Sequence, residues 1–146
     1  MKILTSATLA LLLVVPVFLL GCQSDTVEFD EGEVVTFEGT IEDLTEIDTY
    51  NFVVTNQGTV RIELTALDVR NGDTGEPVES RGIGVAFGRL GAAGGCTPTV
   101  SDVIKQTEAI SVFVPEGVYC LGVFAPAGLY PDGTVLDYTI ELVSGA

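Results

Sequence analysis

The residues that could do chemistry in this chain are its carboxylates and three cysteines, because none of the 146 residues is histidine. Without histidine, Ser-His-Asp triads, Cys-His pairs and histidine-based metal sites are all excluded, and most hydrolase mechanisms are excluded with them. Two carboxylates alone can hydrolyse a glycosidic bond. Here the acidic residues lie mainly in an N-terminal stretch and in turns, and no tryptophan is present to stack on a sugar ring. We therefore predict that the protein is not an enzyme.

Calcium is the metal that the remaining side chains would suit best. Carboxylates and loop carbonyl oxygens are the ligands that this hard cation prefers. No EF-hand spacing occurs, and the simpler interpretation is that these are ordinary turn and surface carboxylates. We expect no other cofactor, and the sequence leaves the set of metal ligands undetermined. The candidates, all in or beside predicted turns, are Asp48, Asp73, Glu76, Asp132 and Asp137.

Cys22 follows a segment with the layout of a signal peptide. Lys2 precedes an apolar run from Leu9 to Leu20, which is too short for a membrane-spanning helix of roughly 20 residues and contains Pro16. The junction Leu-Leu-Gly-Cys at 19–22 resembles the lipobox of bacterial lipoproteins, and the resemblance implies cleavage before Cys22 and lipid attachment to it. The alternative is a chance cysteine after an ordinary signal peptide.

The resemblance to lipoproteins also bears on location. In that family the residue after the lipidated cysteine influences sorting, and here it is Gln23 rather than the aspartate associated with inner-membrane retention. We therefore expect a lipid-anchored protein of the cell envelope, in the outer rather than the inner membrane if the organism has two. A single-membrane organism would carry it on the outside of its only bilayer.

The other two cysteines, Cys96 and Cys120, are predicted to form a disulfide. An exported compartment permits the bond, and closing a loop of about 25 residues would add about 3 kcal/mol in the chain-entropy model. A metal pair or a nucleophile are the alternatives. Zinc would normally need two further Cys or His ligands.

Charge and length divide the chain into three parts. The formal net charge is −15, and loss of Lys2 with the signal peptide makes it −16, so nucleic acid and anionic lipid head groups are poor partners. Ten acidic residues precede Arg61, the first basic residue after Cys22. We predict a signal peptide over 1–21, an acidic tether over 22–32, and one folded domain over 33–146.

Apolar residues alternate with polar ones through most of the predicted domain, which indicates β-strands. The pattern predicts a first strand that ends near Ile41, with Gly39 at an inward position where close packing is expected. It predicts hairpins over 48–67 and over 110–123, a strand over 83–88 and a closing strand through 138–142.

The intervening segments are assigned by their turn residues and composition. Residues 69–80 contain Asn-Gly-Asp and Gly-Glu-Pro and are predicted to be a loop. Residues 100–106 are predicted to form a short helical turn. An exposed Tyr130 could mark a contact surface, but a tyrosine near a loop is more often explained by packing. These elements together predict an all-β fold, a single antiparallel β-sandwich of jelly-roll type, with an up-and-down β-barrel as the alternative.

Three phrases resemble the bacterial pre-peptidase C-terminal domain. They are Phe-Glu-Gly-Thr-Ile at 37–41, Asp-Thr-Tyr-Asn-Phe-Val-Val at 48–54, and Pro-Glu-Gly-Val-Tyr-Cys-Leu-Gly-Val at 115–123. Members of that family are small β-sandwiches appended to secreted enzymes, and some relatives bind calcium, fibrous polymers or carbohydrates. The resemblance therefore implies an accessory or binding module. No peptidase domain accompanies it in this sequence.

These observations favour a noncatalytic, envelope-anchored lipoprotein whose β-sandwich acts as a binding or structural surface module. Its expected partners are a membrane, through the lipid on Cys22, and a protein or polysaccharide, but not nucleic acid. A calcium-dependent adhesion or carbohydrate-binding module is the second hypothesis. A carboxylate-only envelope hydrolase is the third and least favoured.

Overall fold

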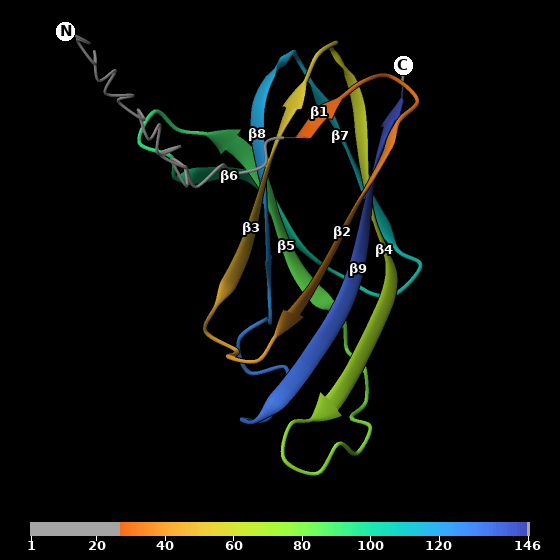
Figure 1. The fold of residues 1–146 in the computed structure, drawn as a ribbon, viewed down its shortest axis with the longest axis vertical. Coiled ribbons are helices and arrows are strands. Elements are labelled where there is room, and N and C mark those ends of the chain that lie inside the picture. The colour runs from red at the N-terminus through yellow and green to blue at the C-terminus, as the bar shows by residue number, and fades with distance from the viewer. Residues whose placement is uncertain (1–26, 146) are drawn as a thin grey trace, which may run out of the picture.

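The computed structural model describes residues 27–145, and within them all regular structure is β-strand (Figure 1). No helix of this part of the chain is long and apolar enough to span a membrane. In chain order the strands are β1 (Val27–Phe29), β2 (Val34–Ile41), β3 (Ile47–Val54), β4 (Gly58–Asn71), β5 (Ile83–Leu90), β6 (Cys96–Ile104), β7 (Ala109–Val114), β8 (Gly117–Phe124) and β9 (Thr134–Gly145).

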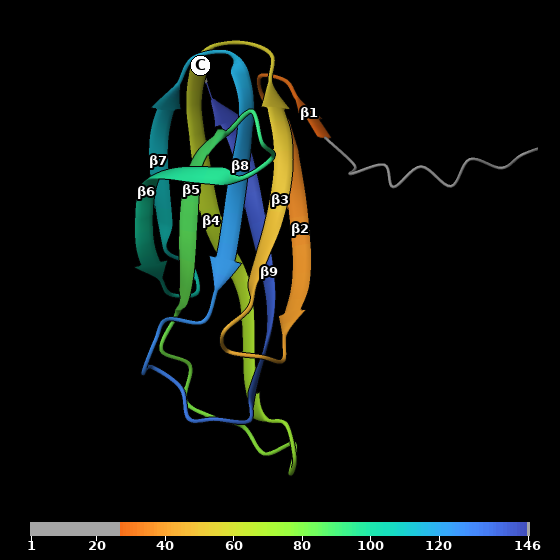
Figure 2. The same ribbon diagram turned by 90° about the vertical axis from the view of Figure 1, so that its left-hand side faces the viewer.

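The strands form two sheets packed face to face, and the turned view of Figure 2 shows the two layers. The five-stranded sheet has the order β1-β3-β8-β5-β6 and the four-stranded sheet the order β2-β9-β4-β7. All pairs of neighbouring strands are antiparallel except β1 and β3, which are parallel. The predicted β-sandwich is therefore confirmed, and the sheets do not close into the alternative barrel.

The core lies between the two sheets and is built by the alternating apolar residues. Phe52, Phe87 and Leu121 project into it from the five-stranded sheet, and Ile62 and Ile140 from the four-stranded sheet; all five are fully buried. Because successive side chains of a strand point to opposite faces, the polar residues between them form the outer faces of the sandwich. The outer faces are thus where a binding site can be built.

Both predicted hairpins are wrong. β3 and β4 lie in different sheets, and so do β7 and β8. The short loops at 55–57 and 115–116 therefore connect the two sheets instead of reversing within one sheet (Figure 1). Alternation identifies which side chains point inward. It does not distinguish a turn within a sheet from a crossing between sheets, because both sheets share one core.

Two further local predictions need correction. Residues 100–104, predicted to begin a helical turn, continue β6, where Val100 and Val103 are β-branched residues that favour a strand. The sequence predicts an acidic tether over 22–32, yet Val27–Phe29 within it pairs with the end of β3. The parallel pairing shows that the sheet begins before residue 33.

Candidate functional site

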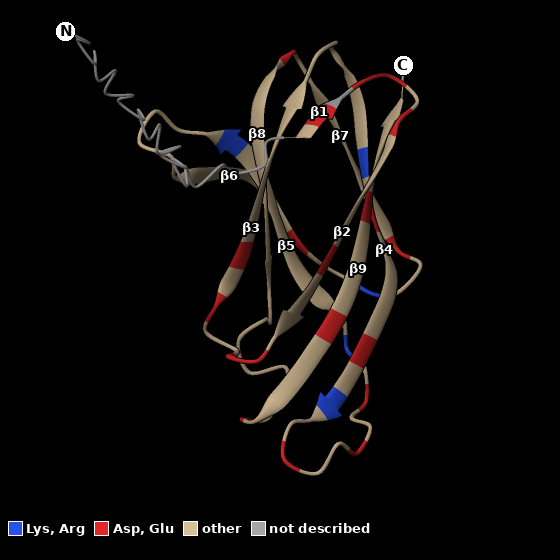
Figure 3. Ribbon diagram, viewed as in Figure 1, with Lys and Arg blue, Asp and Glu red and all other residues tan. Residues whose placement is uncertain are grey.

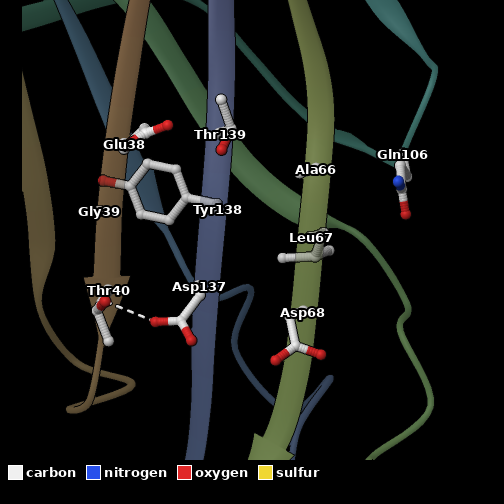
Figure 4. Close-up of a pocket in the computed structure, with 10 residues that line it drawn as sticks. All are labelled: Glu38, Gly39, Thr40, Ala66, Leu67, Asp68, Gln106, Asp137, Tyr138 and Thr139. Atoms are coloured by element: carbon white, nitrogen blue, oxygen red, sulfur yellow. Dashed lines mark hydrogen bonds between the residues drawn. The ribbon is translucent and has the colours of Figure 1, made fainter.

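A hollow with a volume of about 600 Å³ lies on the outer face of the four-stranded sheet. It is open and shallow, and Figure 4 shows its side chains rising from β2, β9 and β4. Its lining combines carboxylates, hydroxyls and an amide with a few apolar groups. The lining residues are Glu38, Gly39, Thr40, Ala66, Leu67, Asp68, Gln106, Asp137, Tyr138 and Thr139.

A bulge in β4 shapes one wall of this hollow. Leu64 pairs with Ile140 but Ala66 pairs with Thr139, so Thr65 is an extra residue in β4. A bulge bends its strand and increases the local twist. The Thr65 hydroxyl donates to the Thr139 carbonyl at 3.2 Å, and its own carbonyl accepts from the Gln106 amide at 3.3 Å. The β6–β7 turn thereby reaches the rim of the hollow.

A charged network fixes the lower part of the hollow. The Arg70 guanidinium forms ion pairs with Asp137 and, at 3.3 Å, with Asp68. The Thr40 hydroxyl donates to the second oxygen of Asp137 at 2.6 Å (Figure 4). The hydrogen bond from Arg70, and then that from Thr40, hold the pKa of Asp137 below its usual range. This direction is opposite to the raised pKa that a general acid needs, and it favours Asp137 as a charged acceptor of hydrogen bonds.

Two hydrogen-bonded tyrosines, the buried Tyr138 and the half-buried Tyr50, support the floor of the hollow. The Tyr138 hydroxyl donates to the Asp48 carboxylate at 2.6 Å and lies 2.6 Å from the Tyr50 hydroxyl. The Tyr50 hydroxyl also lies 3.2 Å from the Glu38 carbonyl oxygen, a second acceptor within its reach. Burial raises the pKa of Tyr138 first of all, and the bond to Asp48 raises it further. These hydrogen bonds join β9 and β2 of one sheet to β3 of the other.

Gly39 makes room for this arrangement. A Cβ atom at Gly39 would lie 2.3 Å from the Tyr138 hydroxyl oxygen and 2.8 Å from that of Tyr50. Both distances are far below van der Waals contact, so only glycine lets the two rings pass beneath β2. The close packing that the sequence predicts at Gly39 is thus present.

The five carboxylates predicted as calcium candidates do not assemble into one site. Asp137 lies in the hollow and Asp48 beneath its floor, whereas Asp73 and Glu76 lie in the β4–β5 loop. Asp132 lines a second hollow of about 370 Å³, together with Glu42 and Asp43. Within residues 27–145 no group of three or more Cys, Asp or Glu side chains is placed to hold a metal ion. Calcium binding stays a prediction without a described site.

Sequence reasoning missed most of the hollow. It singled out Asp137 but not Glu38, Thr40, Asp68 or Arg70, which occupy outward positions of three strands. Their alternation with core residues was visible in the sequence. That these outward positions lie side by side depends on the strand order β2-β9-β4, which the pattern does not contain.

The structure also places the cysteines and Tyr130. Cys96 and Cys120 form a disulfide with their Cα atoms 5.7 Å apart. Cys22 lies outside the described residues, so its lipid attachment stays a prediction. Tyr130 packs into the domain, which is the interpretation that the sequence favours: it is buried, and its hydroxyl donates to the Gly82 carbonyl at 2.7 Å and accepts from the Arg81 amide at 2.9 Å. Tyr130 thereby anchors the segment that contains Arg81 and Gly82, and its side chain is not available as a contact surface.

No family model and no curated protein matches the sequence. Among solved structures, the chain is similar to the pre-peptidase C-terminal domain of collagenase from Bacillus anthracis, with 17% identity and a TM-score of 0.45 over 82% of this chain and 94% of that one. It is also similar to PliG of Aeromonas hydrophila, a periplasmic inhibitor of g-type lysozyme, with 10% identity and a TM-score of 0.46 over 82% and 96%. These likenesses are too distant to assign a function.

Proposed function

We propose that the protein is a noncatalytic lipoprotein of a bacterial cell envelope, anchored by lipid on Cys22, whose β-sandwich binds a protein or polysaccharide through the hollow on the four-stranded sheet. The observation that supports binding is the fixed polar lining of the hollow. Thr40 and Arg70 hold Asp137 in place, and the buried Tyr138 supports the floor. Polar groups that are fixed in advance lose less entropy when a partner binds.

The chemistry of the lining suits donors on the partner. The Glu38, Asp68 and Asp137 carboxylates accept hydrogen bonds from ammonium, guanidinium or sugar hydroxyl groups. Thr139 and Gln106 add groups that can both donate and accept. An open hollow on a sheet face fits an extended surface better than a small molecule, since small-molecule sites usually enclose most of their ligand. This supports a macromolecular partner.

The anchor sets where such a module would work. Only four residues lie between Cys22 and Val27, the first residue of β1, so the Cα atoms of Cys22 and Val27 are at most about 18 Å apart. The reach is shorter than a tether running to residue 32 would give, because β1 belongs to the sheet. An anchored domain would stay close to its bilayer, in the outer membrane of an organism with two.

Site-specific photo-crosslinking in cells tests the proposal. A photoreactive residue in place of Thr139, inside the hollow, is expected to crosslink a partner in the membrane fraction. The same residue in place of Thr49, which is exposed on the other sheet, serves as the control and is expected to crosslink far less. Cys22→Ser is expected to release the protein from membranes. Equal crosslinking at both positions would contradict binding through the hollow. Retention of Cys22→Ser in membranes would contradict anchoring by lipid on Cys22.

A further inference from the structure

β7 is an edge strand with one open side. It pairs with β4 through residues 109–114 and with no other described strand. Its sequence, Ala-Ile-Ser-Val-Phe-Val, contains no charged residue and no proline. Phe113 points outward with 68% of its surface exposed, the most exposed of the large apolar side chains described. Such a strand is a template for the addition of another strand.

The other three sheet edges carry features that oppose strand addition. β1 is only three residues long and includes Glu28, and β2 carries Glu38 at an exposed outward position. β6 contains Pro98 and Asp102 and has a register shift opposite Phe87. Short edges, charges, prolines and bulges are the devices by which natural proteins block edge pairing. Among the four edges of the described sheets, β7 alone has none of these.

The side chains of β7 complement those of a second copy. Residues that face each other across an antiparallel pair point to the same side of the sheet. Two identical strands therefore pair symmetrically about one central residue, which lies opposite its own copy. Pairing about Ser111 aligns five residues: Phe113 lies opposite Ala109, Ile110 opposite Val112, and Ser111 opposite its own copy. The largest exposed side chain thus meets the smallest one. Pairing about Ile110 or Val112 leaves Phe113 or Ala109 without a partner.

We propose that β7 pairs antiparallel with β7 of a second copy, about Ser111, and joins two four-stranded sheets into one of eight strands. The charge pattern agrees with this. A chain of net charge −15 repels its copy over most of its surface, whereas the six residues of β7 bring no charge to the contact. Because salt screens the surrounding charges, self-association strengthens as the ionic strength rises.

Cysteine crosslinking of the full chain in membranes tests the register. Paired Cα atoms in an antiparallel ladder are about 4.5–5.5 Å apart, which is within the range that a disulfide bridges. Mild oxidation is expected to link Ser111→Cys into a dimer, with the 111–111 peptide identified by mass spectrometry and the 96–120 bond intact. Phe113→Cys and Thr49→Cys are the controls, and both are expected to remain at the level of the unaltered chain.

The outcomes separate the proposal from its competitors. Dimer formation in all three variants, or in none above the unaltered chain, overturns it. Linkage of Ser111→Cys to a chain of different mass also overturns it, because a different protein would then occupy the edge.

Sedimentation equilibrium of the purified full chain provides a second test that needs no new cysteine. Ser111→Glu is expected to abolish self-association, because the two new carboxylates face each other at the centre of the pairing. Within one copy the substitution is tolerated, since Ser111 lies opposite Arg61. Thr49→Glu adds the same charge on the other sheet and is expected to associate like the unaltered protein. A monomeric unaltered protein at high salt, or loss of association in Thr49→Glu instead, contradicts pairing through β7.

Discussion

At the scale of single residues, Asp48 shows how a carboxylate beside a turn can serve the fold. The sequence makes it a candidate calcium ligand, and in the structure it accepts a hydrogen bond from the hydroxyl of Tyr138, a residue that is only 2% exposed. A buried hydroxyl without a partner is costly, and a charged acceptor makes the bond stronger than a neutral one does. Asp48 thereby helps to hold the two sheets together beneath the hollow.

Replacing Tyr138 with phenylalanine is expected to lower the free energy of unfolding by about 1.5–3 kcal/mol, the usual contribution of a hydrogen bond to a charged group. The ring and its packing stay, so the loss reports the hydroxyl. Tyr119→Phe is the matched control, because the Tyr119 hydroxyl donates to the neutral Pro115 carbonyl at 2.7 Å and should cost less. Urea unfolding measures both, and a loss no larger than that of Tyr119→Phe would mean that Asp48 adds nothing to this contact.

At the scale of elements, the disulfide ties the β5–β6 hairpin to β8 of the same sheet. Cys120 belongs to β8, two strands away from β6, so the bond joins two strands that lie on either side of β5. A Cβ atom at Gly88 would lie 1.9 Å from the Thr97 carbonyl oxygen, so glycine is what allows β6 to fold back so closely. Figure 1 shows the tip of this hairpin projecting from the sandwich.

The double substitution Cys96→Ala with Cys120→Ala is expected to lower the free energy of unfolding by about 3 kcal/mol, because the bond closes a loop of 25 residues in the unfolded chain. Chemical unfolding of the unaltered protein with and without reductant should give the same difference. Reductant should not affect the double variant. A double variant as stable as the oxidised protein would show that the hairpin is held by its strand pairing alone.

The sequence predicts the fold class and most strand positions because one core imposes a period of two on every strand. It predicts the disulfide because two cysteines remain once Cys22 is set aside. Strand order cannot be predicted in this way. Whether the loop before Gly58 joins two strands of one sheet or connects the two sheets depends on contacts between distant residues. The hollow depends on that order, so only Asp137 of its charged network could be singled out in advance.

At the scale of the whole molecule, charge is distributed unevenly over the two sheets. Acidic residues lie in loops at both ends and on the outer face of the four-stranded sheet (Figure 3). The outward positions of β8 are uncharged, with Val118, Gly122 and Phe124 among them. With a net charge of −15, most carboxylates repel one another. Those with a basic or hydroxyl partner are the exceptions, and they decide how the fold responds to acid.

Asp137 gives this response a definite sign. Because its pKa is lower in the folded protein than in the unfolded chain, its contribution is complete well above the ordinary aspartate pKa of about 3.9 and is lost as the pH falls through the folded value. Asp137→Asn is therefore expected to be less stable than the unaltered protein at pH 7, by less than Tyr138→Phe, and the gap should narrow as the pH falls below the ordinary aspartate pKa of about 3.9. Asp73→Asn removes an equal charge from an exposed loop, and its difference from the unaltered protein should change less with pH. Urea unfolding across this range decides the matter: a gap for Asp137→Asn that stays constant down to pH 3 would mean that the ion pair with Arg70 does not stabilise the fold.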